Sequence, residues 1–280
     1  MSEMKKIVLT PRGFSSIPIE AEIISPDVFV GKTLEEIRNL PIYYGNEKVE
    51  MKEYIHAQGK VADKPEEQLI VIDGDARHIK QIGKGMTTGR IVVQGDAGMH
   101  LGAQMSGGDI TVTGNALDWA GAEMKGGLIR ILGDAGNLLG AAYRGSSEGM
   151  TGGCILLTGK AGSELGSFMR RGKIVVIGDT SDFTGVHMSG GEIFIFGKPG
   201  KRVGAQAKGN GGFIACFNGV DDILPTYRYE TTYTPVFMRM YLKNLYEKLG
   251  VTTAAQYIDK PLKRYRGDLA VGGNAEILVG

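Results

Sequence analysis

The stretch GAQMSGGDITVTG, residues 102–114, returns nineteen residues later as GAEMKGGLIRILG, residues 121–133. Four more copies occur along the chain: GKGMTTGRIVVQG at 83–95, SEGMTGGCILLTG at 147–159, GSFMRRGKIVVIG at 166–178 and GVHMSGGEIFIFG at 185–197. In every copy a glycine follows the methionine by three residues, and two aliphatic residues then alternate with variable ones up to a closing glycine. A fixed period near twenty residues indicates a solenoid.

The composition of one repeat predicts which kind of solenoid this is. The alternation of aliphatic and variable residues is typical of a short strand with one buried face. Glycines bracket each strand and suit tight corners, and no segment between them is long enough for a helix. We therefore predict a mainly β protein, a right-handed single-stranded β-helix, whose coils stack at ~4.8 Å with the isoleucine, valine and methionine columns inside.

The repeats divide the chain into three parts. Residues 1–65 do not repeat, and we predict a small α+β cap there, with strands at Lys6–Thr10 and Pro18–Ile24. Thr33 and Glu36 form a capping-box pattern for a short helix that Pro41 ends. Residues 66–220 are predicted to form the β-helix of 19-residue coils, beginning with a degenerate coil at 69–74.

Residues 221–280 are predicted to form a C-terminal helix and an extended tail. Thr234 and Pro235 suit the start of a helix and Gly250 its end, and a strand is expected at Ala275–Val279. The basic stretch Lys260–Arg266 has two interpretations, an anion site or a solvated or partner-facing segment, of which we favour the second.

Charge and cysteine content exclude several classes of function. Lys and Arg total 32 and Asp and Glu 31, a formal charge of +1, which argues against nucleic-acid and anionic-membrane binding. The start of the chain has no apolar signal segment, so a soluble, cytoplasmic protein is expected. Cys154 and Cys216 stand far apart with no C-x-x-C pattern, so we predict two free thiols and no metal site in this chain.

The strand positions that point outward carry a separate signal. Late coils place a run of apolar residues there, and early coils place polar ones. The apolar outward positions are Leu156, Val175, Ile177, Phe194 and Phe196. An exposed patch of this size is unusual on a free monomer, so either the C-terminal helix or another subunit is expected to cover it. We treat these residues as a candidate subunit interface and expect the C-terminal helix to cover part of it.

One interval breaks the period. The distance from Met124 to Met150 is 26 residues, because seven residues, Tyr143–Gly149, are inserted. Insertions in solenoids map to loops on one face, often the binding face, and Tyr143 and Arg144 are residue types enriched at interfaces. They complete the candidate interface, although a tolerated surface loop explains the insert equally well.

Catalytic patterns are weak. The G-D-A-G runs at 95–98 and 133–136 are followed by another strand, not by the helix that a phosphate loop requires. His100 and His187 lie in columns of mixed composition and are interpreted as surface residues. Asp118, Glu123 and Asp182 form no evident carboxylate pair. We predict no catalytic, cofactor-binding or metal-binding residue in this chain.

The repeat G-x-x-M-x-x-G-x-I-x-[IV]-x-G resembles that of the C subunit of formylmethanofuran dehydrogenase. The phrases DWAGAEM, GAAYRG and YRGDLA are similar to the same family, and the C-terminal β-helix domain of glutamate synthase is a broader relative. The formyltransferase/hydrolase complex of methylotrophs has a similar subunit. The resemblance covers nearly the whole chain.

The resemblance implies a non-catalytic scaffold subunit of a hetero-oligomeric complex. That complex reduces CO2 and attaches it to methanofuran as a formyl group, the first step of methanogenesis from CO2. It implies that other subunits carry the tungsten or molybdenum pterin, the iron–sulfur clusters and a further metal site. The expected partners are a metallopterin subunit, an amidohydrolase-like subunit and ferredoxin-like subunits.

Three alternatives remain open. One is a β-helix subunit of a formyltransferase/hydrolase complex. Another is a glutamate synthase-like spacer domain, disfavoured because no glutaminase or flavin segment accompanies the repeats. The third is a free-standing enzyme on carbohydrate, disfavoured by the missing carboxylate pair.

Overall fold

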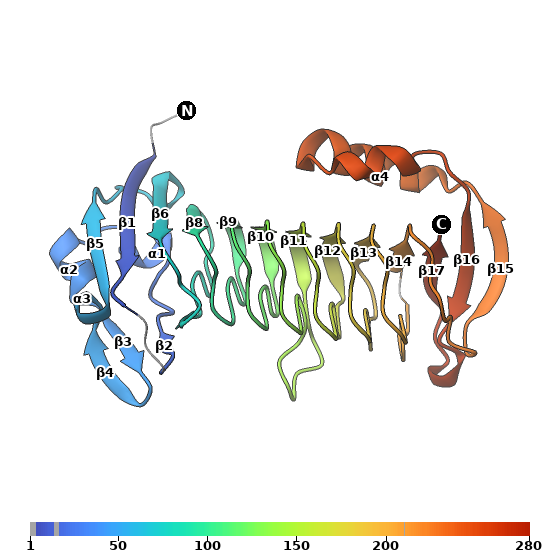
Figure 1. Cartoon of the computed structure of the whole chain (residues 1–280), viewed down its shortest axis with the longest axis horizontal. Coiled ribbons are helices and arrows are strands. Elements are labelled where there is room, and N and C mark those ends of the chain that lie inside the picture. Colours follow the sequence, from blue (N-terminus) through green and yellow to red (C-terminus); the bar gives the residue numbers. More distant parts are fainter. Residues whose placement is uncertain (1–3, 14–16, 210) are drawn as a thin grey trace.

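The computed structural model describes residues 4–13, 17–209 and 211–280, and it is mainly β (Figure 1). Thirteen strands form one long sheet in the order β15-β16-β17-β14-β13-β12-β11-β10-β9-β8-β6-β1-β5. Their bounds are β1 (Lys5–Pro11), β5 (Ile55–Gly59), β6 (Gln68–Asp73), β8 (Arg90–Gln94), β9 (Ser106–Val112), β10 (Lys125–Ile131), β11 (Thr151–Leu157), β12 (Arg171–Val176), β13 (Glu192–Ile195), β14 (Phe213–Cys216), β15 (Arg228–Tyr233), β16 (Leu262–Gly267) and β17 (Ala275–Val279).

The parallel strands pair with their aliphatic residues in register, as the repeat predicts. One buried column runs through Ile7, Ile70, Ile91, Ile110, Ile129, Ile155, Ile174, Ile193, Ile214 and Ile277. A second runs through Leu9, Ile72, Val93, Val112, Ile131, Leu157, Val176, Ile195, Cys216 and Val279. Each strand therefore buries its aliphatic face against the next copy, which is where a repeat protein obtains its stability.

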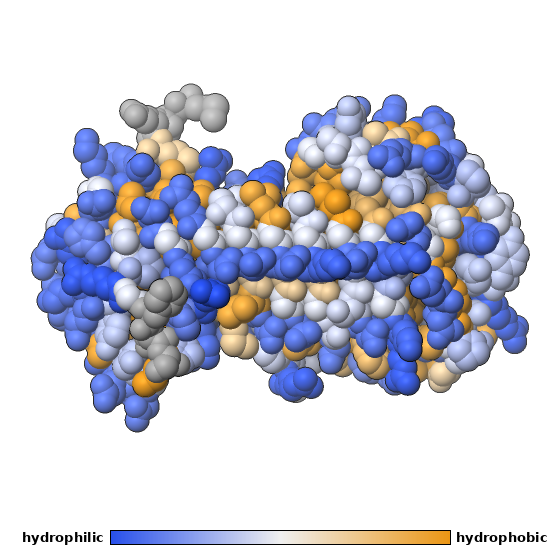
Figure 2. Space-filling model, in the orientation of Figure 1, coloured by the Kyte–Doolittle hydropathy of each residue, from blue (hydrophilic) through white to orange (hydrophobic). Residues whose placement is uncertain are grey.

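A second contact row joins the far side of successive coils. Bridges link Ala76, Ala97, Ala116, Ala135, Ala161 and Thr180 in turn. Figure 1 shows the chain returning to the sheet after each strand, one turn beside the next. The large parallel sheet is consistent with the β-helix prediction, and the handedness of the coil stays a prediction. Because the register is kept, residues of one kind gather in rows, and Figure 2 shows a hydrophilic stripe along the stack.

Glycine is required where a coil turns against its neighbour. Gly121 has φ +64°, and a Cβ there would lie 2.5 Å from Cδ1 of Ile155 on the next coil. A side chain at this corner is excluded both by the left-handed backbone and by the packed isoleucine.

The N-terminal segment is built into the same sheet, since β1 pairs in parallel with β6. A smaller sheet beside it has the order β4-β3-β2-β7. Its strands and the short helices near it are β2 (Ile19–Glu20), β3 (Pro41–Tyr44), β4 (Glu47–Glu50), β7 (Ile79–Lys80), α1 (Pro26–Phe29), α2 (Leu34–Arg38), α3 (Met51–Tyr54) and η1 (Pro65–Glu67). The Thr33–Glu36 capping box is confirmed. The strand predicted over Pro18–Ile24 is shortened to β2, and the boundaries at residues 65 and 220 stay predictions.

The C-terminal segment adds a last rung and a helix. β17 pairs in parallel with β14, and β16 and β15 continue the sheet in antiparallel order. The helices are α4 (Val236–Leu249), η2 (Thr252–Tyr257) and η3 (Leu269–Val271). Pro235, not Thr234, occupies the N-cap of α4, and Gly250 closes the helix with φ +74°. Because η2 and η3 interrupt the segment after α4, the tail is less extended than predicted. None of the described helices is long and apolar enough to cross a membrane.

Helix α4 covers the apolar outward face of the late coils (Figure 1). Phe194 and Val175 are fully buried, and Phe196 and Leu156 are 4% and 8% exposed, in one cluster with Leu242 and other residues of α4. Ile177 packs against the same cluster. The expectation that the C-terminal helix covers part of this face is confirmed. A contact of these five residues with another subunit stays a prediction, and α4 leaves little of Val175 and Phe194 exposed for it.

Candidate functional site

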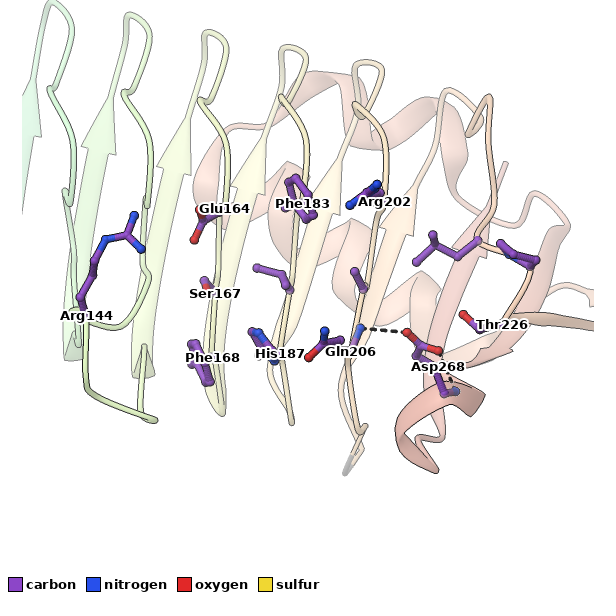
Figure 3. Close-up of a pocket in the computed structure, with 15 residues that line it drawn as sticks. Arg144, Glu164, Ser167, Phe168, Phe183, His187, Arg202, Gln206, Thr226 and Asp268 are labelled. Carbon is purple, nitrogen blue, oxygen red and sulfur yellow. Dashed lines mark hydrogen bonds between the residues drawn. The ribbon is translucent and has the colours of Figure 1, made fainter.

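A groove opens on the coils between the insert and the C-terminal segment (Figure 3). Its volume is about 650 Å³. The lining residues are Arg144, Glu164, Ser167, Phe168, Phe183, Val186, His187, Arg202, Ala205, Gln206, Leu224, Pro225, Thr226, Asp268 and Ala270. Residues far apart in sequence meet here, because the insert borders one end and the segment around Asp268 borders the other.

Three repeat columns from three successive coils form the floor of the groove. The first column is Glu164, Phe183 and Arg202, the second is Ser167, Val186 and Ala205, and the third is Phe168, His187 and Gln206. Within each column the residues are separated by one repeat period of 19 residues. The stacking of the coils therefore places equivalent side chains side by side, as Figure 3 shows.

The first and third columns have a left-handed backbone although they contain no glycine. The φ angles are 60°, 64° and 60° at Glu164, Phe183 and Arg202. They are 58°, 57° and 56° at Phe168, His187 and Gln206. Left-handed backbone costs roughly 1–2 kcal/mol for a residue with a Cβ. The same columns are left-handed at His100 and Trp119 on earlier coils outside the groove, so this backbone belongs to the corner of each coil.

The rings and charges of the groove contact one another. The Phe168 and His187 rings are stacked with centroids 4.5 Å apart, and the Arg202 guanidinium lies 5.2 Å from the centroid of the Phe183 ring. Flat aromatic surface and a guanidinium held against a ring suit the binding of a polypeptide or an anion.

Asp268 is the buried acid of the groove, at 4% exposure. Its carboxylate accepts hydrogen bonds from the backbone N–H groups of Gln206, at 2.9 Å, and Ala270, at 3.0 Å. Burial alone would raise the pKa of this carboxyl, but the hydrogen bonds from Thr226 and these amides outweigh it, so the pKa is lowered. Asp268 is thus a charged anchor that joins the last coil to the C-terminal segment.

The insert lies at the other end, with Arg144 exposed on it. Arg170 of the next coil holds the insert through an ion pair with Glu148, at 3.1 Å, and a hydrogen bond to the carbonyl of Ser147, at 3.3 Å. No described residue forms an ion pair or a hydrogen bond with the side chain of Arg144. It is therefore available to a group outside the chain.

Tyr143 fixes the start of the insert. Its phenolic oxygen lies 3.1 Å from Nδ1 of His100, and its ring belongs to a cluster with His100 and Trp119. Burial, and secondarily Glu123, raises the pKa of Tyr143 to about 12. Tyr143 is therefore a neutral, half-buried anchor, and of the two insert residues only Arg144 lines the groove.

Other sequence candidates are settled by their contacts. In the basic stretch, Arg264 and Arg266 both pair with Glu230 and Glu276. The anion-site interpretation of Lys260–Arg266 is therefore wrong for these two arginines.

Cys154 and Cys216 are free thiols. Within residues 4–13, 17–209 and 211–280, no group of three or more His, Cys, Asp and Glu residues is placed to hold a metal ion.

Sequence reasoning found Arg144 but missed most of the groove. His100 and His187 were expected at the surface, but both are half-buried against aromatic rings. Nothing in the repeat marks His187 as a neighbour of Asp268, which lies beyond the repeats. The repeat does show that these columns line up from coil to coil, but it does not show which coils border the C-terminal segment.

The comparisons with known proteins agree with the fold. No protein-family model matches the chain. It is 45% identical over 100 residues to the C subunit of the tungsten-containing formylmethanofuran dehydrogenase 2 of Methanothermobacter wolfeii, a match covering 36% of this chain and 37% of that relative. It is 39% identical over 99 residues to the C subunit of the molybdenum-containing formylmethanofuran dehydrogenase 1 of Methanosarcina barkeri, covering 35% and 33%. The matches thus span about a third of the length of these curated relatives.

The structural similarity extends over almost the whole chain. A chain in the crystal structure of the formyltransferase/hydrolase complex (FhcABCD) from Methylorubrum extorquens, in complex with methylofuran, superposes with a TM-score of 0.87. The two chains are 30% identical, and the match covers 97% of this chain and 98% of the other. The resemblance predicted from the repeats is confirmed. The chain belongs to the family that comprises the C subunit of formylmethanofuran dehydrogenase and this chain of the formyltransferase/hydrolase complex.

Proposed function

We propose that this chain is a non-catalytic scaffold subunit of an enzyme complex that handles the formyl group carried on methanofuran or a related furan. The observation that carries the proposal is the match to a chain of the formyltransferase/hydrolase complex over 97% of the sequence. A β-helix made of stacked strands is a stiff body, since each coil is hydrogen-bonded to its neighbours along the rod.

The named relatives support a dehydrogenase complex. Both tungsten- and molybdenum-containing enzymes include a C subunit that matches this chain with local identities near 40%. In this form the complex reduces CO2 and attaches it to methanofuran, and the metallopterin, amidohydrolase-like and ferredoxin-like subunits carry the tungsten or molybdenum pterin, the iron–sulfur clusters and a metal site. We also assign the complex to the cytoplasm, on the resemblance alone.

The second candidate is a formyltransferase/hydrolase complex, and the full-length structural match favours it. In either case the described residues of this chain do not fit a metal or cluster site. Burial raises the pKa of Cys154 to about 11 and that of Cys216 to about 12, so neither thiol is a ready thiolate ligand. We infer no reaction step on this chain.

The test is to tag the full chain in the cells that make it, purify it under native conditions and identify the polypeptides that accompany it in fixed ratio. A dehydrogenase complex predicts tungsten or molybdenum and iron in the complex, and a formyltransferase/hydrolase complex predicts formylfuran-dependent activity without tungsten or molybdenum. Stoichiometric tungsten, molybdenum or iron on the separated chain contradicts the scaffold role. A chain that purifies alone contradicts the subunit role itself.

A further inference from the structure

We propose that the groove between the insert and the C-terminal segment docks an extended segment of another subunit, and that carboxylate side chains of this segment bind Arg144 at one end of the groove and Arg202 toward the other (Figure 3). The inference rests on the proposed function and deepens it, because it assigns one face of the rod to one kind of partner. The groove takes the place of the apolar outward face as the candidate contact surface, because α4 covers that face.

The first argument is the surface of the groove. The groove contains stacked rings at Phe168 and His187 and an arginine over Phe183, which together form a contoured surface of the kind found at protein interfaces.

The second argument is charge. Asp268 is buried and its oxygens are occupied by backbone amides. Of the groove's exposed or half-buried ionic side chains, Arg144, Arg202 and Glu164, none has an ion-pair partner among the residues described, so the accessible excess is positive. Arg202 is held against the Phe183 ring, which orients its planar donor groups for a carboxylate. A partner segment with an Asp or Glu residue near each arginine complements this surface.

The third argument is shape. Sites for small molecules usually enclose roughly 70–90% of the ligand surface, whereas this groove runs openly across three coils (Figure 3). Three coils at the ordinary strand spacing cover about 10 Å, which fits about three extended residues. The open form favours a polypeptide segment over a free small carboxylate.

The experiment introduces a reactive amine at the docking point. The full chain with R202K is purified as its complex and treated with a carbodiimide, which joins amines directly to carboxylates, and the linked peptides are identified by mass spectrometry. We expect a link between the introduced amine and an Asp or Glu residue of another subunit. The native amine of Lys201, exposed on the same coil and outside the groove, is the internal control.

Charge reversal gives an independent measurement. R144E and R202E are each expected to weaken the binding of the chain to the rest of the complex by roughly tenfold. K201E, the same charge change one residue away, is expected to bind as the wild type does. Circular dichroism checks that all three variants fold.

The outcomes separate the docking inference from the proposed function. An intact complex in which the introduced amine links only to Glu164 of the same chain, to a second copy, or to nothing overturns the docking inference and leaves the subunit role standing. Unchanged assembly of R144E and R202E, with free glutamate binding to the isolated chain, assigns the groove to a small carboxylate and also overturns it. A wild-type chain without any partner overturns both.

Discussion

The phenolic oxygen of Tyr143 lies 3.1 Å from Nδ1 of His100, and this contact ties the insert to a coil 43 residues earlier. His100 also stacks on Trp119, with ring centroids 5.5 Å apart. The insert is therefore anchored at both ends, by Tyr143 on the earlier coils and by Arg170 on the later one. Arg144 is held in the groove between these anchors.

Removing the hydroxyl of Tyr143 should loosen the first anchor. Y143F is expected to lower the free energy of unfolding by about 1 kcal/mol, the usual net contribution of one hydrogen bond. Urea unfolding followed by the fluorescence of Trp119, the single tryptophan, measures the loss. Y246F makes the same chemical change at a tyrosine that is 46% exposed on α4 and should have no effect. Equal losses in both variants would contradict the anchoring role.

His100 should make stability depend on pH. Burial, and then Lys80, lowers the pKa of His100 below its ordinary value near 6.5. The unfolded chain therefore binds a proton more readily than the folded one, so the contribution of His100 is complete above about pH 6.5 and is lost as the pH falls through the lowered pKa.

H100N tests this dependence, because asparagine tolerates the left-handed backbone at this position. The difference in urea midpoint between about pH 7.5 and about pH 5.5 should be smaller in H100N than in the wild type. An unchanged difference would mean that His100 does not contribute to the acid sensitivity of the chain.

Helix α4 should be held by one face alone. Leu242 is fully buried against the outward face of the coils, whereas Met240, two residues earlier, is 73% exposed. L242A is expected to cost about 2–5 kcal/mol and to make residues 236–249 sensitive to proteases. M240A should stay within about 0.5 kcal/mol of the wild type. Similar protease sensitivity in both variants would contradict the one-sided packing of α4.

The stability cost of replacing a corner glycine should depend on which atoms lie beside it. Gly121 and Gly85 have similar φ angles, 64° and 66°. A Cβ at Gly121 would meet Cδ1 of Ile155 at 2.5 Å, and a Cβ at Gly85 would meet nothing within 4 Å. G85A should cost roughly 1–2 kcal/mol from backbone strain alone, and G121A should cost roughly 1–3 kcal/mol more because the core is overpacked. Thermal unfolding of the two variants gives the comparison.

The two thiols should react slowly in the folded chain. Burial raises the pKa of Cys154 to about 11 and that of Cys216 to about 12, so little thiolate is present near pH 8. Cys154 is partly exposed and should be alkylated by iodoacetamide before Cys216, which is fully buried. Mass spectrometry over time measures both rates, and denaturant should make them equal. Rapid labelling of Cys216 without denaturant would contradict its burial.

The sequence by itself determined the ladder of the fold, that is, which strands of successive coils pair and in what register. The positions of Ile110 and Ile129 in the 19-residue period predict that they pair, and they do. The offset of 26 residues between the paired Ile129 and Ile155 shows that the insert lies outside the ladder. Such prediction works because each coil contacts only its neighbours, so one local pattern, repeated, specifies the contacts along the rod.

Only the tertiary structure decided what covers the rod and where its groove lies. Phe194 and Phe196 indicate an apolar face in the sequence, but an intrachain helix and another subunit hide such a face equally well. The helix that covers them lies beyond the repeats, and Asp268 reaches Gln206 across 62 residues. These contacts follow no period. They depend on how the C-terminal segment folds back on the last coils, where burial of Leu242 and the charge of Asp268 select one arrangement.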